Sequence, residues 1–330
     1  MNNKDSLQIT DFESGITLNC FMDKIMYIKP TQISEHKDDD YHIYFICSLP
    51  KAYFVKDSIK FTASKLSCEL IHNGENIKID KSYLEIFDGS PLTETDFTLS
   101  KDNSTLTLTF YKNFIKQKEV VVSANEIFGA SGLMETKKEK ILYIGQAFGE
   151  SGKRTAGVRL ENHSTLQRIL SDIQSSGSDE EVQLYLMNFK MEHILQLSGY
   201  SSRAKNDAAA NTFFDTMDDY NQEMCINLVE ASLINYFKPK YNVQYKKKIF
   251  SQNSSKFKIF YQNNISKISV QILPTEYSDE YLSQMNIRMP RIIFYTDNTE
   301  YNTGSYNEFI TTNLDQNLYS TYAQLKAYNI

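Results

Sequence analysis

Three residues in the middle of the chain have side chains suited to phosphate chemistry. Arg159 and His163 stand four positions apart, a spacing that places both on one face of a helix. The guanidinium of Arg159 matches the oxygens of a phosphate group, and the imidazole of His163 can orient a nucleophile or move a proton. Glu230 interrupts an apolar strip that includes Ile226 and Ile234, so its carboxylate is a candidate ligand for a hard divalent cation. Together these residue types suit metal-dependent hydrolysis of a phosphodiester.

Each of these residues also has an ordinary structural interpretation. Arg159 could be a surface arginine on a helix, and a single histidine such as His163 is more often structural than catalytic. Glu230 could be a helix glutamate that pairs with a neighbouring lysine. The residue types alone leave both interpretations open.

The distribution of charge bears on whether a nucleic acid is a partner. The chain has 330 residues and a formal net charge of −6, which by itself argues against a polyanionic ligand. Resolved by region, residues 1–135 carry −6, residues 136–250 carry +1 and residues 251–330 carry −1. The middle region is therefore compatible with binding to phosphate groups, whereas the acidic N-terminal region suits a partner-binding or regulatory role.

Two groups of basic residues lie in this middle region. Lys153 and Arg154 belong to the first, close to Arg159. The second is the stretch 238–248, which holds five lysines, two tyrosines and no acidic residue. Basic residues interleaved with aromatic ones suit contacts with a nucleic-acid backbone. The expected substrate contacts are Lys153, Arg154, Lys246, Lys247 and Lys248.

Hydrophobic periodicity divides the chain into three regions and predicts an α+β multidomain protein. Residues 1–135 read as short strands with period-2 alternation and tight turns such as Asn73-Gly74, which predicts an antiparallel, sandwich-like β-rich domain. Residues 136–250 alternate strands with helices, which predicts an α/β domain. Residues 251–330 return to strand periodicity and predict a β-containing extension.

Local patterns predict the elements that carry the candidate residues. Residues 140–144 form an apolar strand, and residues 166–173 repeat apolar side chains at helical spacing. A second helix spans roughly 218–237 and ends before a proline. Residues 198–211 are small and polar and predict a loop, and the alternation at 257–261 predicts a strand.

Three segments, taken in order, resemble the GIY-YIG nuclease superfamily, which includes homing endonucleases, excision-repair nucleases and some restriction enzymes. Residues 142–146, Leu-Tyr-Ile-Gly-Gln, match a YIG strand. Residues 159–163 have the family's Arg-x-x-x-His spacing. Residues 230–242 begin with a glutamate and end in a Phe-x-Pro-x-Tyr-Asn turn. The resemblance covers about residues 136–245, a third of the chain.

The resemblance implies a metal-dependent endonuclease with a GIY-YIG-like α/β domain at 136–250. Its cofactor would be a divalent metal ion, Mg²⁺ or Mn²⁺. Its substrate would be a nucleic acid, and the resemblance favours DNA because most of the family cuts DNA. A role in restriction or phage defence follows by analogy. Tyr143 would orient or deprotonate the attacking water, Gly145 would allow close approach of the backbone, and Asn242 would fix the backbone or border the site. The implied catalytic residues are Tyr143, Arg159, His163, Glu230 and Asn242, with Glu230 as the metal ligand.

One family motif has no counterpart at its usual position. The GIY motif places a tyrosine on a strand roughly ten residues before the YIG tyrosine, where this chain has Ser-Gly-Leu-Met at 131–134. The preceding strand, expected at 120–124, also lacks a tyrosine. The role of the first tyrosine is therefore unfilled, moved, or taken by another side chain. An alternative function follows, in which the protein is a catalytically inactive relative that binds nucleic acid.

Other classes of function find little support. The sequence has no phosphate-loop or dinucleotide glycine pattern, and no cysteine–histidine spacing typical of zinc. Its four cysteines are widely spaced, which is typical of reduced thiols. No apolar run approaches the ~18 residues of a membrane span and no signal-peptide core follows Met1, so we expect a cytoplasmic protein without a membrane partner. A further alternative is an interaction protein whose residues 1–135 bind protein, carbohydrate or a second copy of the chain.

Overall fold

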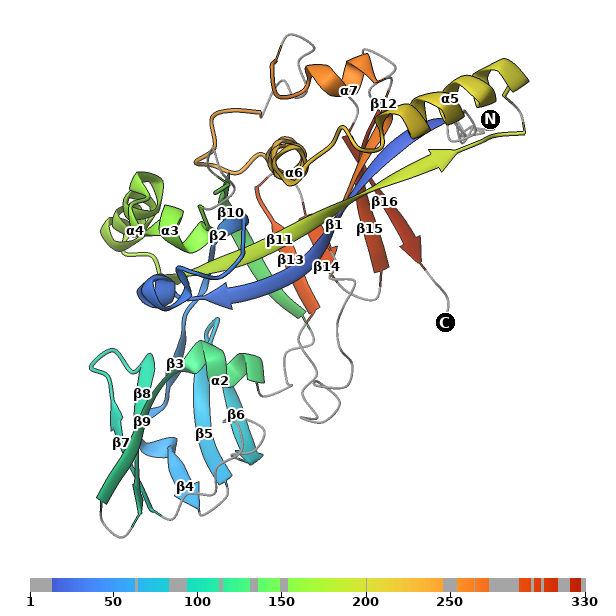
Figure 1. The fold of residues 1–330 in the computed structure, drawn as a ribbon. Coiled ribbons are helices and arrows are strands. Elements are labelled where there is room, and N and C mark those ends of the chain that lie inside the picture. The colour runs from blue at the N-terminus through green and yellow to red at the C-terminus, as the bar shows by residue number, and fades with distance from the viewer. Residues whose placement is uncertain are drawn as a thin grey trace, which may run out of the picture.

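A curled, mixed sheet forms the centre of the protein (Figure 1). In the computed structural model its nine described strands follow the order β14-β13-β10-β2-β11-β1-β12-β15-β16. Strands β10, β2, β11 and β1 are antiparallel neighbours, whereas β12 joins β1 and β13 joins β10 in parallel. The fold is therefore mixed α/β. The strands of this central sheet are β1 (Gly15–Ile28), β2 (Ile43–Pro50), β10 (Thr136–Gln146), β11 (Glu180–Gln196), β12 (Ile265–Gln271), β13 (Arg291–Tyr295), β14 (Glu300–Thr303), β15 (Tyr306–Asn313) and β16 (Thr321–Ala327).

The structure describes most of the chain between residues 14 and 327. The described residues are 14–62, 65–82, 94–112, 115–130, 136–148, 154–199, 201–245, 254–263, 265–272, 291–297, 300–303, 306–313 and 321–327. The helices are η1 (Pro30–His36), η2 (Lys56–Ser58), α2 (Ala124–Ala130), α3 (Ala156–Glu161), α4 (Ser164–Ser176), α5 (Arg203–Thr216), α6 (Gln222–Phe237) and α7 (Lys258–Gln262). The remaining strands are β3 (Ala52–Phe54), β4 (Lys60–Thr62), β5 (Lys65–His72), β6 (Glu75–Ser82), β7 (Glu94–Leu99), β8 (Thr105–Lys112) and β9 (Ile115–Ser123).

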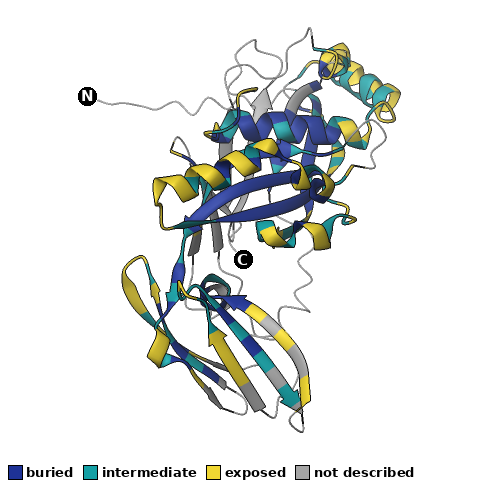
Figure 2. Ribbon diagram, turned by 90° about the vertical axis from the view of Figure 1, so that its left-hand side faces the viewer, coloured by how far each residue is buried: buried dark blue, intermediate teal, exposed yellow. Residues whose placement is uncertain are grey.

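Different helices cover the two faces of the central sheet, and strand alternation assigns each side chain to one of them. In β2, Ile43 and Phe45 pack into the core beneath α6. Tyr44 and Ile46, which point to the opposite face, pack with residues of α3 and α4. Figure 2 shows α6 as a largely buried helix, in contrast to the exposed α5. The sheet is therefore buried on both faces where β2 and β10 run side by side.

A bulge in β10 places Tyr143 on the α3–α4 face. Ile141 pairs with Cys47 and Tyr143 with Ile46, so Leu142 is the extra residue in the strand. As a result, Leu142 and Tyr143 both face the α3–α4 side. A regular strand would have turned one of these two side chains toward α6.

Residues between β2 and β10 form a separate domain with its own core. Two small sheets, β3-β5-β4 with β6 and β7-β8-β9, share this core with α2. We call residues 51–135 the inserted domain. In Figure 1 it lies below the central sheet, and the chain enters from β2 and returns through β10.

The central sheet crosses both boundaries expected from the sequence. Residues 1–135 were expected to form one domain, but β1 and β2 lie in the same sheet as β10 and β11. Residues 251–330 were expected to form an extension, but β12 and β13 pair with β1 and β10. Period-2 alternation identifies a strand without identifying its partners, so it cannot separate an inserted domain from the sheet that carries it.

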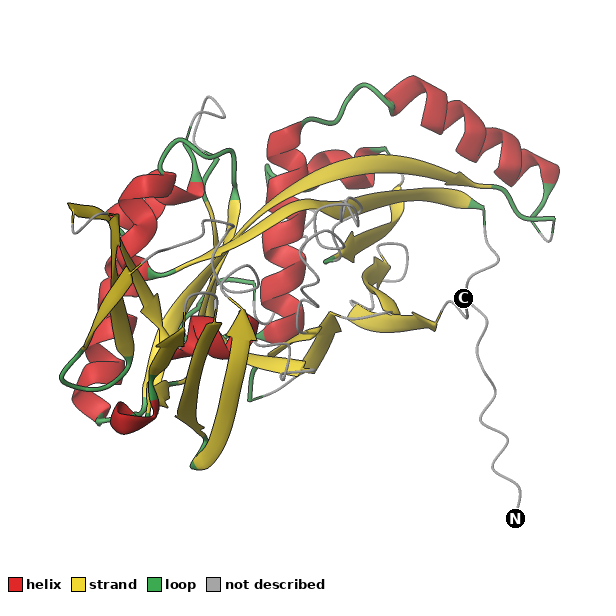
Figure 3. Cartoon of the chain, turned by 90° about the horizontal axis from the view of Figure 1, so that it is seen from below, coloured by secondary structure: helices red, strands yellow, loops and turns green. Residues whose placement is uncertain are grey.

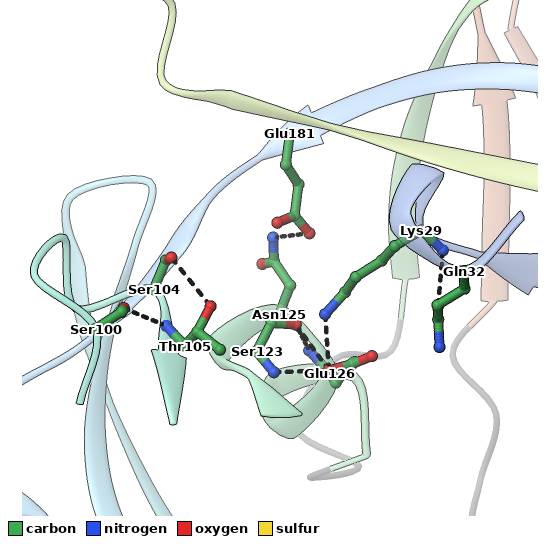
Figure 4. A network of polar contacts seen from close by, with 9 residues as sticks. All are labelled: Lys29, Gln32, Ser100, Ser104, Thr105, Ser123, Asn125, Glu126 and Glu181. Atoms are coloured by element: carbon green, nitrogen blue, oxygen red, sulfur yellow. Dashed lines mark hydrogen bonds and ion pairs between the residues drawn. The ribbon is translucent and has the colours of Figure 1, made fainter. Parts of the chain in front are cut away.

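A polar junction joins the inserted domain to the central sheet (Figure 4). The Asn125 side chain donates to the Glu181 carboxylate at 2.6 Å and to the carbonyl of Pro50 at 3.2 Å. Lys29 forms an ion pair of 3.0 Å with Glu126. Since Asn125 and Glu126 belong to α2, this helix fixes the inserted domain against β11 and the end of β1.

Two predicted elements have a different conformation in the structure. Residues 198–211 were expected to form a loop, but α5 begins at Arg203, with Ser202 as its N-cap, and lies beside the outer ends of β1 and β11 (Figure 3). Its alanines have high helix propensity, which the polar composition concealed. Residues 257–261 were expected to form a strand but lead into α7, where Phe257 and Phe260 are both buried at helical spacing.

The predicted thiols and the predicted absence of a membrane helix can both be compared with the structure. All four cysteines are free thiols buried in the two cores. Over the part of the chain that the structure describes, no helix is both long and apolar enough to span a bilayer.

Because the inserted domain has its own core, we expect the central sheet to fold without residues 51–135. Ser48 near the end of β2 pairs with Lys140 of β10, so in a chain that lacks residues 51–135 the six retained residues between this pair can form the connecting loop with an Asn-Gly linker. In this variant we expect Cys20, Cys47 and Cys225 to stay unreactive toward a thiol reagent until denaturant is added, because all three lie in the main core. Immediate reaction of these thiols in the native buffer would show that the central sheet depends on the inserted domain.

Candidate active site

The candidate site lies where β2 begins and β10 ends. Tyr44 of β2 is paired with Gly145 of β10. A Cβ atom at Gly145 would come within 2.5 Å of the Tyr44 hydroxyl and 2.7 Å of the Tyr143 ring. Only glycine therefore leaves room for both rings, whose centroids are 6.2 Å apart. This close approach is the role expected for Gly145.

His163 reaches the site from a helix other than the one that carries Arg159. The four-residue spacing was expected to place both residues on one helical face, but α3 ends at Glu161 and His163 is the N-cap of α4. Its Nδ1 accepts a hydrogen bond of 3.1 Å from the backbone N–H of Leu166. The helix breaks after Glu161, and the His163 side chain then caps the first turn of α4. The spacing of residues in the sequence does not reveal this break.

The N-cap bond fixes the tautomer of His163. A backbone N–H can only donate, so Nδ1 carries no proton and the neutral imidazole is protonated at Nε2. Nε2–H then donates to the hydroxyl of Tyr44, 3.1 Å away. Burial, with the positive charges of Arg159 and Arg154, lowers the pKa of His163 to about 4. At neutral pH His163 is therefore an uncharged donor that orients Tyr44.

Arg159 and Tyr143 lie close to Tyr44 as well. The guanidinium of Arg159 acts to lower the pKa of the Tyr44 phenol. The Tyr44 and Tyr143 rings have centroids 6.2 Å apart, and the Tyr44 hydroxyl acts to lower the pKa of Tyr143. Burial has the larger effect and raises the pKa of both tyrosines, and the negative charge of Glu230 adds to this.

Glu230 lies on α6. Burial raises the pKa of its carboxyl to about 7, against the opposing effects of Lys256, Gln146 and Arg159. Its negative charge in turn raises the pKa of Tyr143, so Glu230 lies within electrostatic range of Tyr143 and Arg159. The rings of Tyr143 and His163 lie together, with centroids 5.0 Å apart.

Asn227 links the two remaining polar side chains around Glu230. Its Oδ1 accepts from Gln146 Nε2 and from Lys256 Nζ, each at 2.9 Å. Gln146 also acts to lower the pKa of Glu230. None of these residues was predicted from the sequence. Gln146 follows the YIG tripeptide directly, so its position was a usable signal, whereas Lys256 lies beyond the segment that resembles the nuclease family.

Asn242 supports the site from the edge of β10 and takes no part in its polar contacts. Its buried side chain accepts from the N–H of Ile144 at 2.9 Å and donates to the carbonyl of Ile144 at 2.7 Å. The N–H of Tyr241 bonds to the carbonyl of Leu142 at 3.0 Å. The described residues of β13 pair with β10 over Thr136–Lys140. Beyond Lys140, the turn after α6 provides the hydrogen-bond partners for the backbone on this edge of β10. Asn242 was expected either to fix the backbone or to border the site, and these hydrogen bonds fix the backbone.

Tyr44 is the principal residue of the site that was not predicted. It precedes Tyr143 by 99 positions, because the whole inserted domain separates the two strands. The strand expected before the YIG tyrosine, at 120–124, overlaps β9, which pairs with β8 and not with β10. Residues 131–134 lie outside the described residues. The usable signal was His42-Ile43-Tyr44 at the start of an apolar strand, a tripeptide similar to GIY.

The structure describes only part of the predicted basic surface. Arg154 is exposed and close enough to lower the pKa of His163. Lys153, Lys246, Lys247 and Lys248 lie outside the described residues. Lys240 and Arg168 both lie over the ring of Tyr241, at 5.1 and 5.5 Å from its centroid, and so add positive charge beside the turn that ends in Asn242.

A single carboxylate is the metal-binding group that this site offers. Within the described ranges, no three His, Cys, Asp or Glu side chains gather so that they could hold a metal ion. Glu230 has a raised pKa because it is desolvated, which is the condition that a bound cation would relieve. Mg²⁺ commonly binds through one or two carboxylates and completes its shell with water and substrate phosphate. The residues present therefore fit a weakly held, substrate-assisted ion.

Comparison of the chain with known protein families, with curated proteins and with solved structures finds no match. The site therefore has to be interpreted from its own residues and geometry.

We expect Asn242→Ala to destabilise the protein without removing any group from the polar site. The substitution leaves the N–H and carbonyl of Ile144 buried and unsatisfied, so the free energy of unfolding should fall by about 3 kcal/mol in urea denaturation. Asn162→Ala removes an exposed asparagine and should change it by less than about 0.5 kcal/mol. Equal effects of the two substitutions would show that the amide does not hold the strand edge.

Glu230→Gln should stabilise the metal-free protein at high pH. The unfolded carboxyl ionises near its ordinary pKa of 4.5 while the folded one keeps its proton up to about 7. The wild type therefore loses stability as pH rises from 4.5 to 7, by up to about 3 kcal/mol. Thermal unfolding in EDTA should show a gain for Glu230→Gln at pH 8 and almost none at pH 4.5.

Glu223→Gln provides the control for this measurement. Glu223 is an exposed residue on the same helix, so its substitution should have equally small effects at both pH values. A gain for Glu230→Gln that does not depend on pH would contradict the assigned desolvation of Glu230.

Proposed function

We propose that the protein is a metal-dependent endonuclease that hydrolyses phosphodiester bonds in DNA, with a site of the GIY-YIG type. The observation that carries the proposal is the packing of His163 against Tyr44 and Tyr143, with Arg159 and the desolvated carboxyl group of Glu230 within electrostatic range. These groups come from β2, β10, α3, α4 and α6, so they are distant in sequence. Perturbed titratable groups gathered from several elements are typical of catalytic sites.

Tyr44 supports an active enzyme over the inactive relative. The inactive alternative depended on the absence of a first tyrosine. Tyr44 stands on the strand next to Tyr143 and faces the same side of the sheet, with ring centroids 6.2 Å apart. We therefore assign the place of the family's first motif to residues 42–44, displaced along the chain by the inserted domain.

The surroundings of the two tyrosines suggest a different role for each. Tyr44 is fully buried and its hydroxyl is held by His163, so it serves as an oriented group. Tyr143 is half-buried, and Arg159 and Tyr44 offset part of the rise in its pKa that burial causes. We infer that Tyr143 takes the proton of the attacking water and that Tyr44 stabilises the resulting charge.

The remaining groups neutralise charge on the phosphate. Arg159 presents a fork of donors that suits the equatorial oxygens of the transition state. Glu230 would hold the divalent ion, Mg²⁺ or Mn²⁺, which when bound supplies positive charge to the phosphate oxygens and acidifies water. His163, neutral at physiological pH, contributes orientation and not a proton.

The inserted domain is the proposed recognition module. It leaves the central sheet between the two strands that carry Tyr44 and Tyr143, so a partner or DNA target bound there lies in direct connection with the site. This assigns to residues 51–135 the partner-binding role that their location suggests. A place in restriction or phage defence, in the cytoplasm, is part of the same proposal.

Cleavage of supercoiled plasmid DNA tests the proposed function. We expect nicking or linearisation with Mg²⁺ or Mn²⁺, none in EDTA, and loss of at least about a hundredfold in rate for Glu230→Ala. Glu223→Ala, on the exposed side of α6, should retain the wild-type rate. Tyr44→Phe should reduce the rate about tenfold or more.

Two results would support the alternatives. Salt-dependent DNA binding without cleavage at any metal tested would support the inactive relative. No salt-dependent DNA binding at all would support an interaction protein with a structural α/β core.

A further inference from the structure

Lys256 brings a positive charge to the candidate site from outside the nuclease-like segment. It precedes α7, in the region that follows residue 250. Its Nζ donates to Asn227 Oδ1 at 2.9 Å, one helical turn before Glu230 on α6. The same oxygen accepts from Gln146, which acts to lower the pKa of Glu230. The ammonium group therefore lies among the neighbours of the proposed metal ligand.

The backbone at Lys256 is fixed by the core, but its side chain is not. The next residue, Phe257, is buried, and Phe260 stacks on Tyr220 with ring centroids 5.7 Å apart. The N–H groups of Phe257 and Lys258 both bond to the carbonyl of Ser254. Lys256 itself is exposed. The chain thus presents a flexible four-carbon side chain from a rigid position.

A bound divalent ion would make the observed position of Lys256 unfavourable. The ammonium partly neutralises the Glu230 carboxylate, as its charge effect on the pKa of Glu230 shows. A divalent cation at the same carboxylate would repel the ammonium, because like charges interact strongly in a partly buried site. The nearest new source of negative charge would be the phosphate of the substrate.

We propose that Lys256 contacts the substrate: it neutralises Glu230 in the metal-free protein and transfers to a phosphate oxygen of the nucleic acid when a divalent cation binds. The inference rests on the proposed function. It assigns a phosphate contact to the region after residue 250, which otherwise contributes strands to the sheet.

Metal binding to the free protein tests the first half of the proposal. In a calorimetric titration with MnCl₂, Lys256→Gln should bind the ion roughly tenfold more tightly than the wild type, because the competing charge is gone. Lys258→Gln is the matched control: it removes the same charge two residues away, from an exposed position on α7, and should bind as the wild type does.

DNA binding tests the second half. With a short DNA duplex and CaCl₂, Lys256→Gln should weaken binding about tenfold at moderate salt and reduce the slope of log K against log salt by about one, the value for one lost phosphate contact. Lys256→Arg keeps the charge and should retain most of the wild-type slope. Circular dichroism of each variant confirms that the fold is intact.

The outcomes separate this inference from the proposed function. If the wild type binds both Mn²⁺ and DNA but Lys256→Gln behaves like Lys258→Gln in both assays, the role of Lys256 is overturned and the proposed function stands. If Lys256→Gln changes Mn²⁺ affinity alone, the transfer to phosphate is overturned. If the wild type binds no DNA, both the proposed function and the phosphate contact fail.

Discussion

The edge of β10 is the constraint on which the site depends. This strand carries Tyr143 and Gly145, and one side of it is satisfied by β2. Its other side is satisfied first by β13 and then, beyond residue 140, by the side-chain amide of Asn242, which imitates a strand by bonding to both backbone groups of Ile144. Since Asn242 lies in the turn directly after α6, the same contact that closes the sheet also sets the position of Glu230. The hydrogen bonds that satisfy the backbone of β10 therefore also help to place the Glu230 carboxylate.

Folding buries the ionisable groups of this site, and burial disfavours their charged forms. Burial opposes ionisation of Glu230, of both tyrosines and of His163, so each group prefers its neutral form in the absence of a ligand. Arg159 offsets part of that cost for the acids and adds to it for the histidine. A site with this balance gains most from a ligand that brings positive charge to the carboxylate and negative charge to the arginine, which is what a metal ion and a phosphate provide together.

Sequence patterns predicted the residues that lie within continuous local motifs and failed where the chain is interrupted. Glu230 and Asn242 were proposed from the sequence because one helix and one turn contain them. Tyr44 was missed, because the tripeptide at 42–44 lies far along the chain from its partner strand, and the pairing of the two strands is found only in the folded sheet. The break between Arg159 and His163 depends on capping by a histidine, which propensity does not indicate. The two domain boundaries failed for the same reason as Tyr44: periodicity does not encode strand order.

The insertion between β2 and β10 also has a consequence for the order of folding. Ser48 and Lys140 must pair although 92 positions separate them, and closing a free loop of that length costs roughly 4 kcal/mol in chain entropy. The first strand of the inserted domain, β3, packs against its last element, α2, so its two ends come together when it folds. If the inserted domain folds first, it therefore shortens the effective loop and nucleates the pairing of β2 with β10. The inserted domain would then have a second role during synthesis. By folding first, it would bring the strands of Tyr44 and Tyr143 together before the C-terminal strands have been made.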